Sequence, residues 1–479
     1  MFFSSTVVLY SFFLVYQFVI ISLLQGQVKM KEIELNLVIS NQGTTEDLVI
    51  SNQGTAEASV ELGPTVEVSP EHEVTSPVKP PVIVQLMMVM FGLFCLLGYN
   101  FFINNTVYFK LKFDKSDGLK ENFLFYFNFG AMPTTIVCGL SSMLLIKLVR
   151  LEVIIWVSYV NILLSYIIAT TFTMIDTEGW EVAFFVISIM CLMTMIAGGV
   201  CATTALIALC SMMNKELVGR YFLGKGFSGL VAVLINILFT VMLDTGGKDG
   251  VKAGQACFGS GIFMSVCILF LFFMFTRNSY VISFLKKSRN LIVKNEDLDE
   301  GEKKANVKEL FPKAAKLFFV TFFTNFLGMS VHPAMMAKLK STNHFVEDQY
   351  FLLVFLFLIF SVGDLCGKTS SQLIKFPSKD TIVYFAVGRV VLAVMCLMCN
   401  LQPRPIPVWF KADYWPAILV FLFSFSHGQI VCLSYIYAPS VVDNAVDKAV
   451  VGTIHHIGTF VGLILGTVVS FLLQFLSKL

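Results

Sequence analysis

Long apolar runs separated by short polar segments dominate the chain from residue 81 to its end. Most are at least 20 residues long, which is the length that an α-helix needs to cross the hydrocarbon core of a bilayer. Eleven such spans are predicted, at residues 82–109, 123–148, 151–174, 181–212, 219–243, 257–276, 314–338, 349–375, 381–400, 414–439 and 450–476. The pattern therefore predicts an all-α polytopic membrane protein.

Two polar segments divide the chain. Residues 25–80 contain several prolines and the octapeptide LVISNQGT twice, and this composition is typical of a flexible linker. Residues 277–313 are rich in Lys and Arg, which predicts a cytoplasmic loop by the positive-inside rule. We therefore expect a six-helix bundle over residues 81–276 and a five-helix bundle over residues 314–479.

Residues 1–24 form a separate apolar run. Two interpretations stay open, a signal sequence or an extra N-terminal spanning helix. The run has no basic segment before it and no clear cleavage site of small residues. Both features favour the uncleaved helix.

Composition excludes several classes of protein. Hydrophobic residues make up 56% of the chain and charged residues only 14%, against about 25% charged residues in soluble domains. The net charge of +2 offers no electrostatic footprint for nucleic acid. The 11 cysteines lie in or beside apolar runs and are interpreted as small hydrophobic side chains. Since the sequence contains neither a Ser/His/Asp set nor an H-E-x-x-H motif, we expect no enzyme, no metal site and no cofactor.

A few charged side chains lie within the predicted spans. Asp364 and Lys368 are four residues apart, so they share one helix face and can form an ion pair. An unpaired charge at this depth costs about 2.5–3.5 kcal/mol, so the pair serves either to lock helices together or to bind the hydroxyls of a polar solute. Arg389 needs a partner on another helix, either Asp364 or helix-end carbonyls. Lys225 lies near a predicted span end, where its side chain can snorkel to the interface.

Glycines and histidines form the remaining candidates. Gly224 and Gly229 lie in one span, and Gly458, Gly462 and Gly466 recur at every fourth residue of the last span. Such faces let helices approach closely or slide. The histidines within or next to spans are His332, His427, His455 and His456. Each is either a buried neutral histidine or a group that takes part in binding or proton coupling.

Several motifs, taken in order, resemble the equilibrative nucleoside transporter family. The first span, FGLFCLLGYNFFINNTVYF, is similar to the family's opening helix, and LGKGFSG resembles its glycine-rich fifth helix. TNFLGMSVHPAMMAKL, FSVGDLCGKTSS and GRVVLAVMCLMCNLQPR look like the seventh, eighth and ninth helices. The resemblance continues through the last two spans and covers roughly residues 82–476.

The resemblance implies a fold like the major facilitator architecture with one helix fewer, in which two bundles rock around a midplane site. It implies facilitative transport of nucleosides or nucleobases by alternating access. We expect a small-molecule substrate, a surrounding lipid bilayer, a monomer, and the plasma membrane in preference to an organelle. The alternatives are a proton-coupled transporter of the same substrates and a non-transporting receptor or scaffold.

The resemblance also implies a set of site residues. Leu96 and Tyr99 would line the base side, Asp364 would accept hydrogen bonds from the sugar with Lys368 beside it, and Leu463 would face the cavity. Residues at family positions also include Asn100, Ser361 in place of an Asn, and Thr203 in place of a Gln that bonds the base. Gating or structural roles are expected for Arg389, His332, His427, Gly224 and Gly229.

Overall fold

The computed structural model describes residues 79–243, 250–286, 307–333, 335–342, 351–402, 408–442 and 445–476. The predictions for the first 24 residues, for nearly all of the linker and for the middle of the charged loop fall outside the described residues. Residues from Pro80 onward form one compact unit.

Helices account for nearly all of this unit. In chain order they are α2 (Val82–Asn104), α3 (Thr106–Lys112), α4 (Asp117–Leu148), α5 (Leu151–Thr173), α6 (Glu181–Met213), α7 (Lys215–Leu243), α8 (Gly250–Thr276), α10 (Val307–Val331), the π-helix η2 (Leu352–Leu358), α12 (Ile359–Leu373), α13 (Ile382–Leu397), α14 (Tyr414–Tyr437) and α15 (Ala445–Leu476). Each predicted span falls on one of them, and the second half of the chain also holds two short 3-10 helices, Met336–Lys338 and Ala438–Val441.

In the part of the chain that the structure describes, nine helices are long and apolar enough to cross a membrane. The two other predicted spans fall on α12, which has 15 residues and continues η2, and on α13, which has 16. Taken alone, α12 and α13 are each shorter than the roughly 20 residues that a perpendicular span needs, whereas η2 and α12 together run without a break from Leu352 to Leu373. The all-α membrane class is confirmed, and the count of eleven spans stays a prediction.

The first helix ends earlier than the predicted boundary of residue 109. Asn105 leaves the helical region with a ψ of 47°, and its side-chain amide donates a hydrogen bond to the carbonyl of Phe101 at 2.9 Å. Because an Asn side chain can satisfy such a carbonyl, it competes with continued helix formation. The chain then turns and starts again as the short helix α3.

The charged segment also differs from the prediction at its two ends. Residues 279–286 are helical, and α10 begins at Val307 instead of residue 314. Val281 and Leu285 are buried, with 0% and 4% exposure. Since these side chains are four residues apart, they lie on the same face of a helix and stabilise the added turns by packing.

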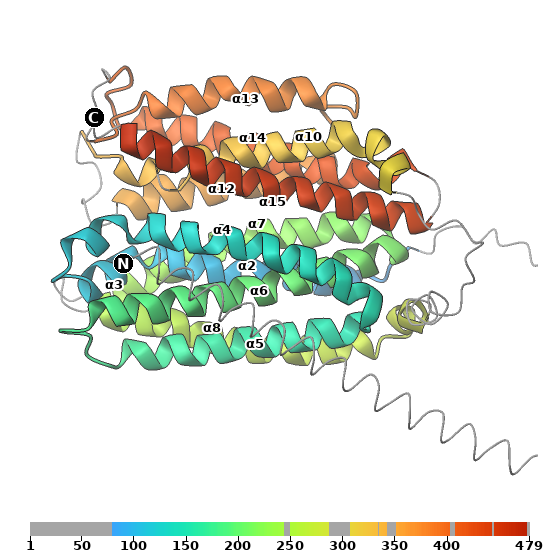
Figure 1. Cartoon of the computed structure of the whole chain (residues 1–479), viewed down its shortest axis with the longest axis horizontal. Helices are drawn as coiled ribbons and strands as arrows, with labels where there is room; N and C mark the ends of the chain where they lie inside the picture. The colour runs from blue at the N-terminus through green and yellow to red at the C-terminus, as the bar shows by residue number, and fades with distance from the viewer. Residues whose placement is uncertain are drawn as a thin grey trace, which may run out of the picture. The chain divides into compact units, whose positions relative to one another are not determined.

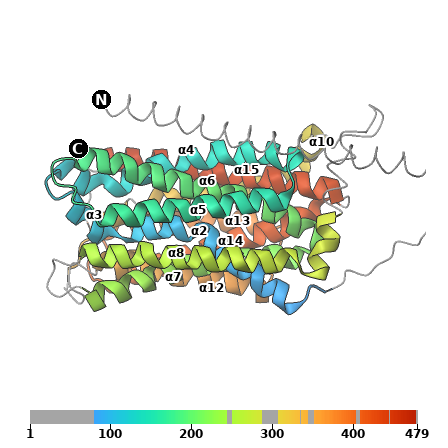
Figure 2. The same ribbon diagram turned by 90° about the horizontal axis from the view of Figure 1, so that it is seen from below.

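The helices form two groups that face each other, α2–α8 in one and α10–α15 in the other (Figure 1). In the first group α2 packs on α7, and α5 packs on α6 and α8; in the second α10 packs on α15, and α12 on α14. The groups meet where α4 contacts α15 and where α7 contacts α12 and α14. Figure 2 shows the α4 and α15 pair at one edge and the α7 and α12 pair at the opposite edge. The space between the two groups is therefore bounded by these two contacts.

Glycines bring neighbouring helices into backbone contact. A Cβ atom added at Gly224 would lie 1.9 Å from the carbonyl oxygen of Val89, where α7 crosses α2. One added at Gly462 would lie 2.3 Å from the carbonyl oxygen of Phe322, where α15 crosses α10. No other side chain fits in so short a distance, so each crossing depends on its glycine.

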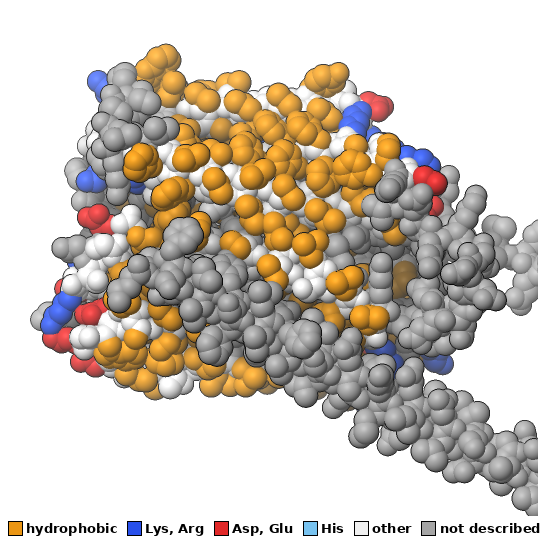
Figure 3. All heavy atoms as spheres, viewed as in Figure 1, with side chains coloured by type: hydrophobic (Ala, Val, Ile, Leu, Met, Phe, Trp, Pro, Cys, Tyr) orange, Lys and Arg blue, Asp and Glu red, His pale blue; other side chains and the backbone are white. Residues whose placement is uncertain are grey.

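The outer surface of the helices is apolar. Figure 3 shows hydrophobic side chains across the middle of one face, and acidic and basic side chains gathered toward its two ends. Exposed large hydrophobic residues occur on both groups, among them Leu144, Leu164, Phe263, Phe270 and Val391. A band of this kind between two charged rims suits the hydrocarbon core of a bilayer.

Candidate functional site

A cavity of about 290 Å³ lies between the two helix groups. On one side α2, α6 and α7 contribute most of its lining, and on the other α10, α12, α14 and α15 do. Its volume is close to the lower end of the range of about 300–1,000 Å³ that small-molecule sites occupy. The lining is predominantly apolar with a few polar groups, which is the usual composition of such a site.

An ion pair lies on the α12 wall of the cavity. Lys368 Nζ donates to Asp364 Oδ2 at 2.5 Å, one helical turn away. Asp364 and Lys368 are 9% and 7% exposed. The predicted pairing across one turn is therefore present, and it offsets part of the cost of placing two charges at this depth.

A histidine completes the surroundings of this carboxylate. His427 Nδ1, on α14, lies 3.1 Å from Asp364 Oδ1. The close approach of α14 depends on Gly428, where an added Cβ would lie 2.2 Å from the backbone oxygen of Asp364. An ionised carboxylate offers about four acceptor positions, and Lys368 and His427 use two. Asp364 thus keeps the capacity to accept hydrogen bonds from a solute in the cavity.

Two α2 residues are held by hydrogen bonds to neighbouring helices. The hydroxyl of Tyr99 donates to Asn128 Oδ1 of α4 at 2.6 Å, and Asn100 Nδ2 donates to Ser228 Oγ of α7 at 2.9 Å. Both residues line the cavity. The bond made by Tyr99 occupies its hydroxyl and leaves the flat ring as its contribution to the lining.

The remaining predicted substrate residues surround the same space. Thr203 Oγ1 lies 2.6 Å from the hydroxyl of Tyr221 and donates to the carbonyl of Gly199 at 2.6 Å, so this hydroxyl is already engaged. Ser361 faces α7, where a Cβ added at Gly229 would lie 2.9 Å from its Oγ. The structure brings all eight predicted substrate residues to one cavity, namely Leu96, Tyr99, Asn100, Thr203, Ser361, Asp364, Lys368 and Leu463.

The residues expected to gate or support the site separate into two sets. His332, His427 and Gly229 line the cavity. The ring of His332 stacks on Phe360 with centroids 3.7 Å apart and an interplanar angle of 11°. Gly224 instead packs against α2, away from the lining.

Arg389 also lies outside the cavity lining. Its guanidinium donates to Ser426 Oγ at 3.0 Å, to the carbonyl of Thr324 at 3.0 Å and to the carbonyl of Phe423 at 3.2 Å. Asp364, one of its two expected partners, is not among these acceptors. The carbonyls belong to the interiors of α10 and α14 instead of to helix ends. Arg389 therefore ties three helices of the second group together.

Sequence reasoning placed Lys225 incorrectly. This side chain lines the cavity between the two helix groups, ten residues into α7, which begins at Lys215. Its Nζ lies 5.6 Å and 5.4 Å from the ring centroids of Tyr221 and Phe222. The predicted span begins at residue 219, which places Lys225 close to its end, whereas the helix begins at Lys215.

The two adjacent histidines of α15 point to different surroundings. His456 lines the cavity, with Nδ1 2.5 Å from the hydroxyl of Tyr435. His455 lies 2.6 Å from Thr321 Oγ1 of α10 through Nε2. Adjacent helical positions diverge by about 100°, which explains why only one of them reaches the cavity.

Comparison with known proteins identifies the family. A family model described as Nucleoside transporter matches residues 187–475, more than half of the chain. Equilibrative nucleoside transporter 3 of Rattus norvegicus is 22% identical over 419 residues, which cover 80% of this chain and 87% of the rat protein. Equilibrative nucleoside transporter 1 of Homo sapiens is 22% identical over 460 residues, which cover 82% of this chain and 96% of the human protein.

The fold matches that of solved transporters. The proton:xylose symporter XylE of the major facilitator superfamily, bound to 6-bromo-6-deoxy-D-glucose, aligns with a TM-score of 0.56 at 14% identity, covering 83% of this chain and 89% of that one. This likeness confirms the expected major-facilitator-like fold. The family match confirms the resemblance seen in the motifs: the chain belongs to the equilibrative nucleoside transporter family.

Proposed function

We propose that this protein carries nucleosides across a membrane, down their concentration gradient, by alternating access. The observation that carries the proposal is the Asp364 carboxylate, held by Lys368 and His427 on the wall of a mainly apolar cavity between two helix groups. A nucleoside is uncharged, with a flat base and a sugar bearing hydroxyl donors. Apolar and aromatic walls suit the base, and a carboxylate with spare acceptor positions suits the sugar.

The contacts between the helix groups support alternating access. The rings of Phe222 on α7 and Tyr435 on α14 have centroids 4.2 Å apart, and those of Phe125 on α4 and Phe471 on α15 have centroids 5.0 Å apart. Since consecutive helices are antiparallel, the early residues of α7 and of α4 lie toward opposite ends of the first group. Rocking of the groups would break one contact while keeping the other.

The remaining expectations belong to the same proposal. We include a monomer as the transporting unit, since the two helix groups that enclose the cavity belong to one chain. We place the segment 277–313 in the cytoplasm, with a six-helix bundle before it and a five-helix bundle after it, and we place the protein in the plasma membrane. Nucleobases are included as substrates, since the proposed interaction with the base does not require the sugar.

Flux measurements with purified protein in liposomes test the proposal. A panel of radiolabelled nucleosides and nucleobases is offered at equal pH on both sides, and uptake is expected to stop when the internal and external concentrations are equal. Accumulation above that level under an inward proton gradient would support the proton-coupled alternative. Binding without flux would support the receptor or scaffold alternative.

A further inference from the structure

Lys225 is a second cation on the cavity wall. It lines the cavity from α7, with Nζ 5.6 Å and 5.4 Å from the ring centroids of Tyr221 and Phe222. Within the described part of the chain no carboxylate lies within ion-pair distance of it. The carboxylate of Asp364 on the cavity wall is already bonded to Lys368.

The two aromatic rings do not fully compensate this charge. A cation–π contact offsets only part of the cost of placing a lysine within a span, and it is strongest when the cation is desolvated. Lys225 borders an open cavity, so its rings offset less of that cost than they would around a desolvated cation. The ammonium group therefore has unused capacity for an anion.

The charges around the cavity sum to one positive charge. Lys225 and Lys368 each contribute +1 and Asp364 contributes −1, counted with the lining histidines His332, His427 and His456 neutral. The two lysines enter from facing helices, since a Cβ added at Gly226, the residue after Lys225, would lie 2.9 Å from Lys368 Cδ. A permeant with a single negative charge would neutralise the site.

We propose that Lys225 binds the ionised base of an acidic nucleoside, so that the protein prefers substrates whose base carries a delocalised negative charge over neutral ones. The inference rests on the proposed transport of nucleosides. The rings of Phe222 on α7 and Tyr435 on α14, which meet across the two helix groups, also line the cavity and suit a flat base whose edge faces the ammonium group. A phosphate ester fits less well, because it carries about −1.5 to −2 charges at pH 7 against the single positive charge of the cavity.

Xanthosine and inosine form a matched pair of probes. Xanthosine has one more oxygen on its base and is largely anionic at neutral pH, whereas inosine stays neutral. With the full chain in liposomes at pH 7 on both sides, unlabelled xanthosine is expected to inhibit labelled inosine uptake at a lower concentration than unlabelled inosine does. Equal or weaker inhibition by xanthosine would overturn the proposal.

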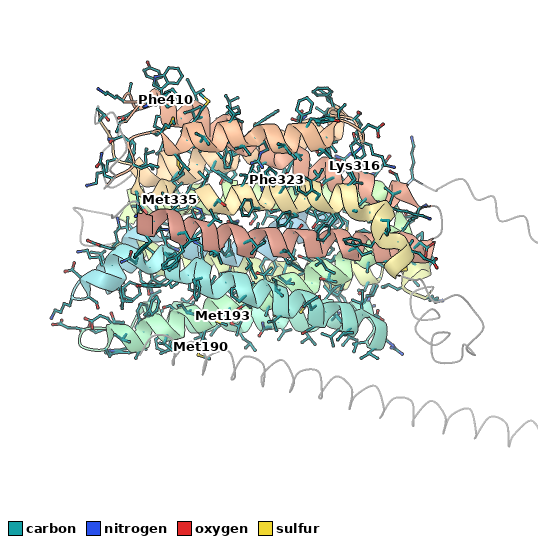
Figure 4. All side chains as sticks on the ribbon, turned by 45° about the horizontal axis from the view of Figure 1, so that its top comes forward. Met190, Met193, Lys316, Phe323, Met335 and Phe410 are labelled. Atoms are coloured by element: carbon teal, nitrogen blue, oxygen red, sulfur yellow. The ribbon has the colours of Figure 1, made fainter. Side chains whose placement is uncertain are left out.

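Substitution of the lysine tests its role directly. Because a hydrogen bond to a charged group contributes about 1.5–3 kcal/mol, Lys225→Gln should lower the ratio of xanthosine to inosine uptake about 10-fold or more, and Lys225→Arg should retain most of it. Lys316→Gln is the matched control, since this exposed lysine on α10 lies outside the cavity lining and pairs with Asp380 (Figure 4). An unchanged ratio in Lys225→Gln would contradict the assignment.

A measurement on the protein without substitutions tests the proposal even if the variants do not fold. Transport of an anion moves charge, so an inside-positive potential of about 100 mV should raise the equilibrium accumulation of xanthosine about 50-fold and leave inosine at equal concentrations. Xanthosine uptake that ignores the potential would overturn the proposal, as would stronger inhibition by inosine 5′-monophosphate than by xanthosine. Absence of flux for inosine, adenosine and uridine would instead refute the proposed transport function.

Discussion

The imidazole of His427 on α14 faces the carboxylate of Asp364 on α12, with Nδ1 3.1 Å from Oδ1. The other carboxylate oxygen accepts from Lys368 at 2.5 Å. The carboxylate on α12 is thus held at one oxygen by a lysine of the same helix and at the other by a histidine of α14. This arrangement makes Asp364 the centre of the proposed site.

Replacement of Asp364 separates substrate binding from helix locking. Asp364→Asn should lower nucleoside uptake at least about 10-fold, because it removes a charged acceptor, and should destabilise the fold by about 3–5 kcal/mol, because Lys368 is left unpaired. The double variant Asp364→Asn, Lys368→Met removes both charges. It should regain thermal stability and stay inactive in uptake at matched surface expression; recovery of uptake would show that the pair is only structural.

The hydrogen bond made by Tyr99 should matter more for stability than for transport. Tyr99→Phe keeps the ring in the cavity and leaves Asn128 Oδ1 without its donor at 2.6 Å. We expect a loss of about 1–3 kcal/mol of stability, seen as a lower melting temperature of the purified protein, with a change in KM of less than about 3-fold. A large rise in KM would place the hydroxyl in contact with substrate.

Arg389 should act on the fold alone. Lysine cannot match the three directions in which the guanidinium donates to Ser426, Thr324 and Phe423, since its ammonium group is a compact point charge. Arg389→Lys should therefore lower stability by about 1.5–3 kcal/mol without changing KM. If KM for a nucleoside rises while the melting temperature holds, Arg389 has a direct part in the site.

The glycine at the crossing of α7 and α2 offers a matched pair of substitutions. Gly224→Ala places a methyl group 1.9 Å from the carbonyl oxygen of Val89, whereas Gly388→Ala on α13 meets nothing within 4 Å. The first should destabilise the protein by about 3 kcal/mol through forced separation of the helices, and the second should stabilise it by about 1 kcal/mol. Equal melting temperatures for both would mean that the crossing is looser than the structure indicates.

Much of the architecture followed from properties that are local in sequence. Apolar length predicts helices across a bilayer, and each predicted span falls on a helix. A spacing of four predicts that Asp364 and Lys368 share a face and can pair. Both inferences concern a single helix, whose geometry is the same in any protein.

The tertiary structure decided which helices meet, and this determined the roles of individual side chains. Arg389 bonds to carbonyls of α10 and α14, and Lys225 borders the cavity instead of the interface. Tyr99 bonds to Asn128, 29 residues away. Such pairings depend on crossings set by close packing between helices that are distant in sequence, and the periodicity of one helix carries no information about its neighbour.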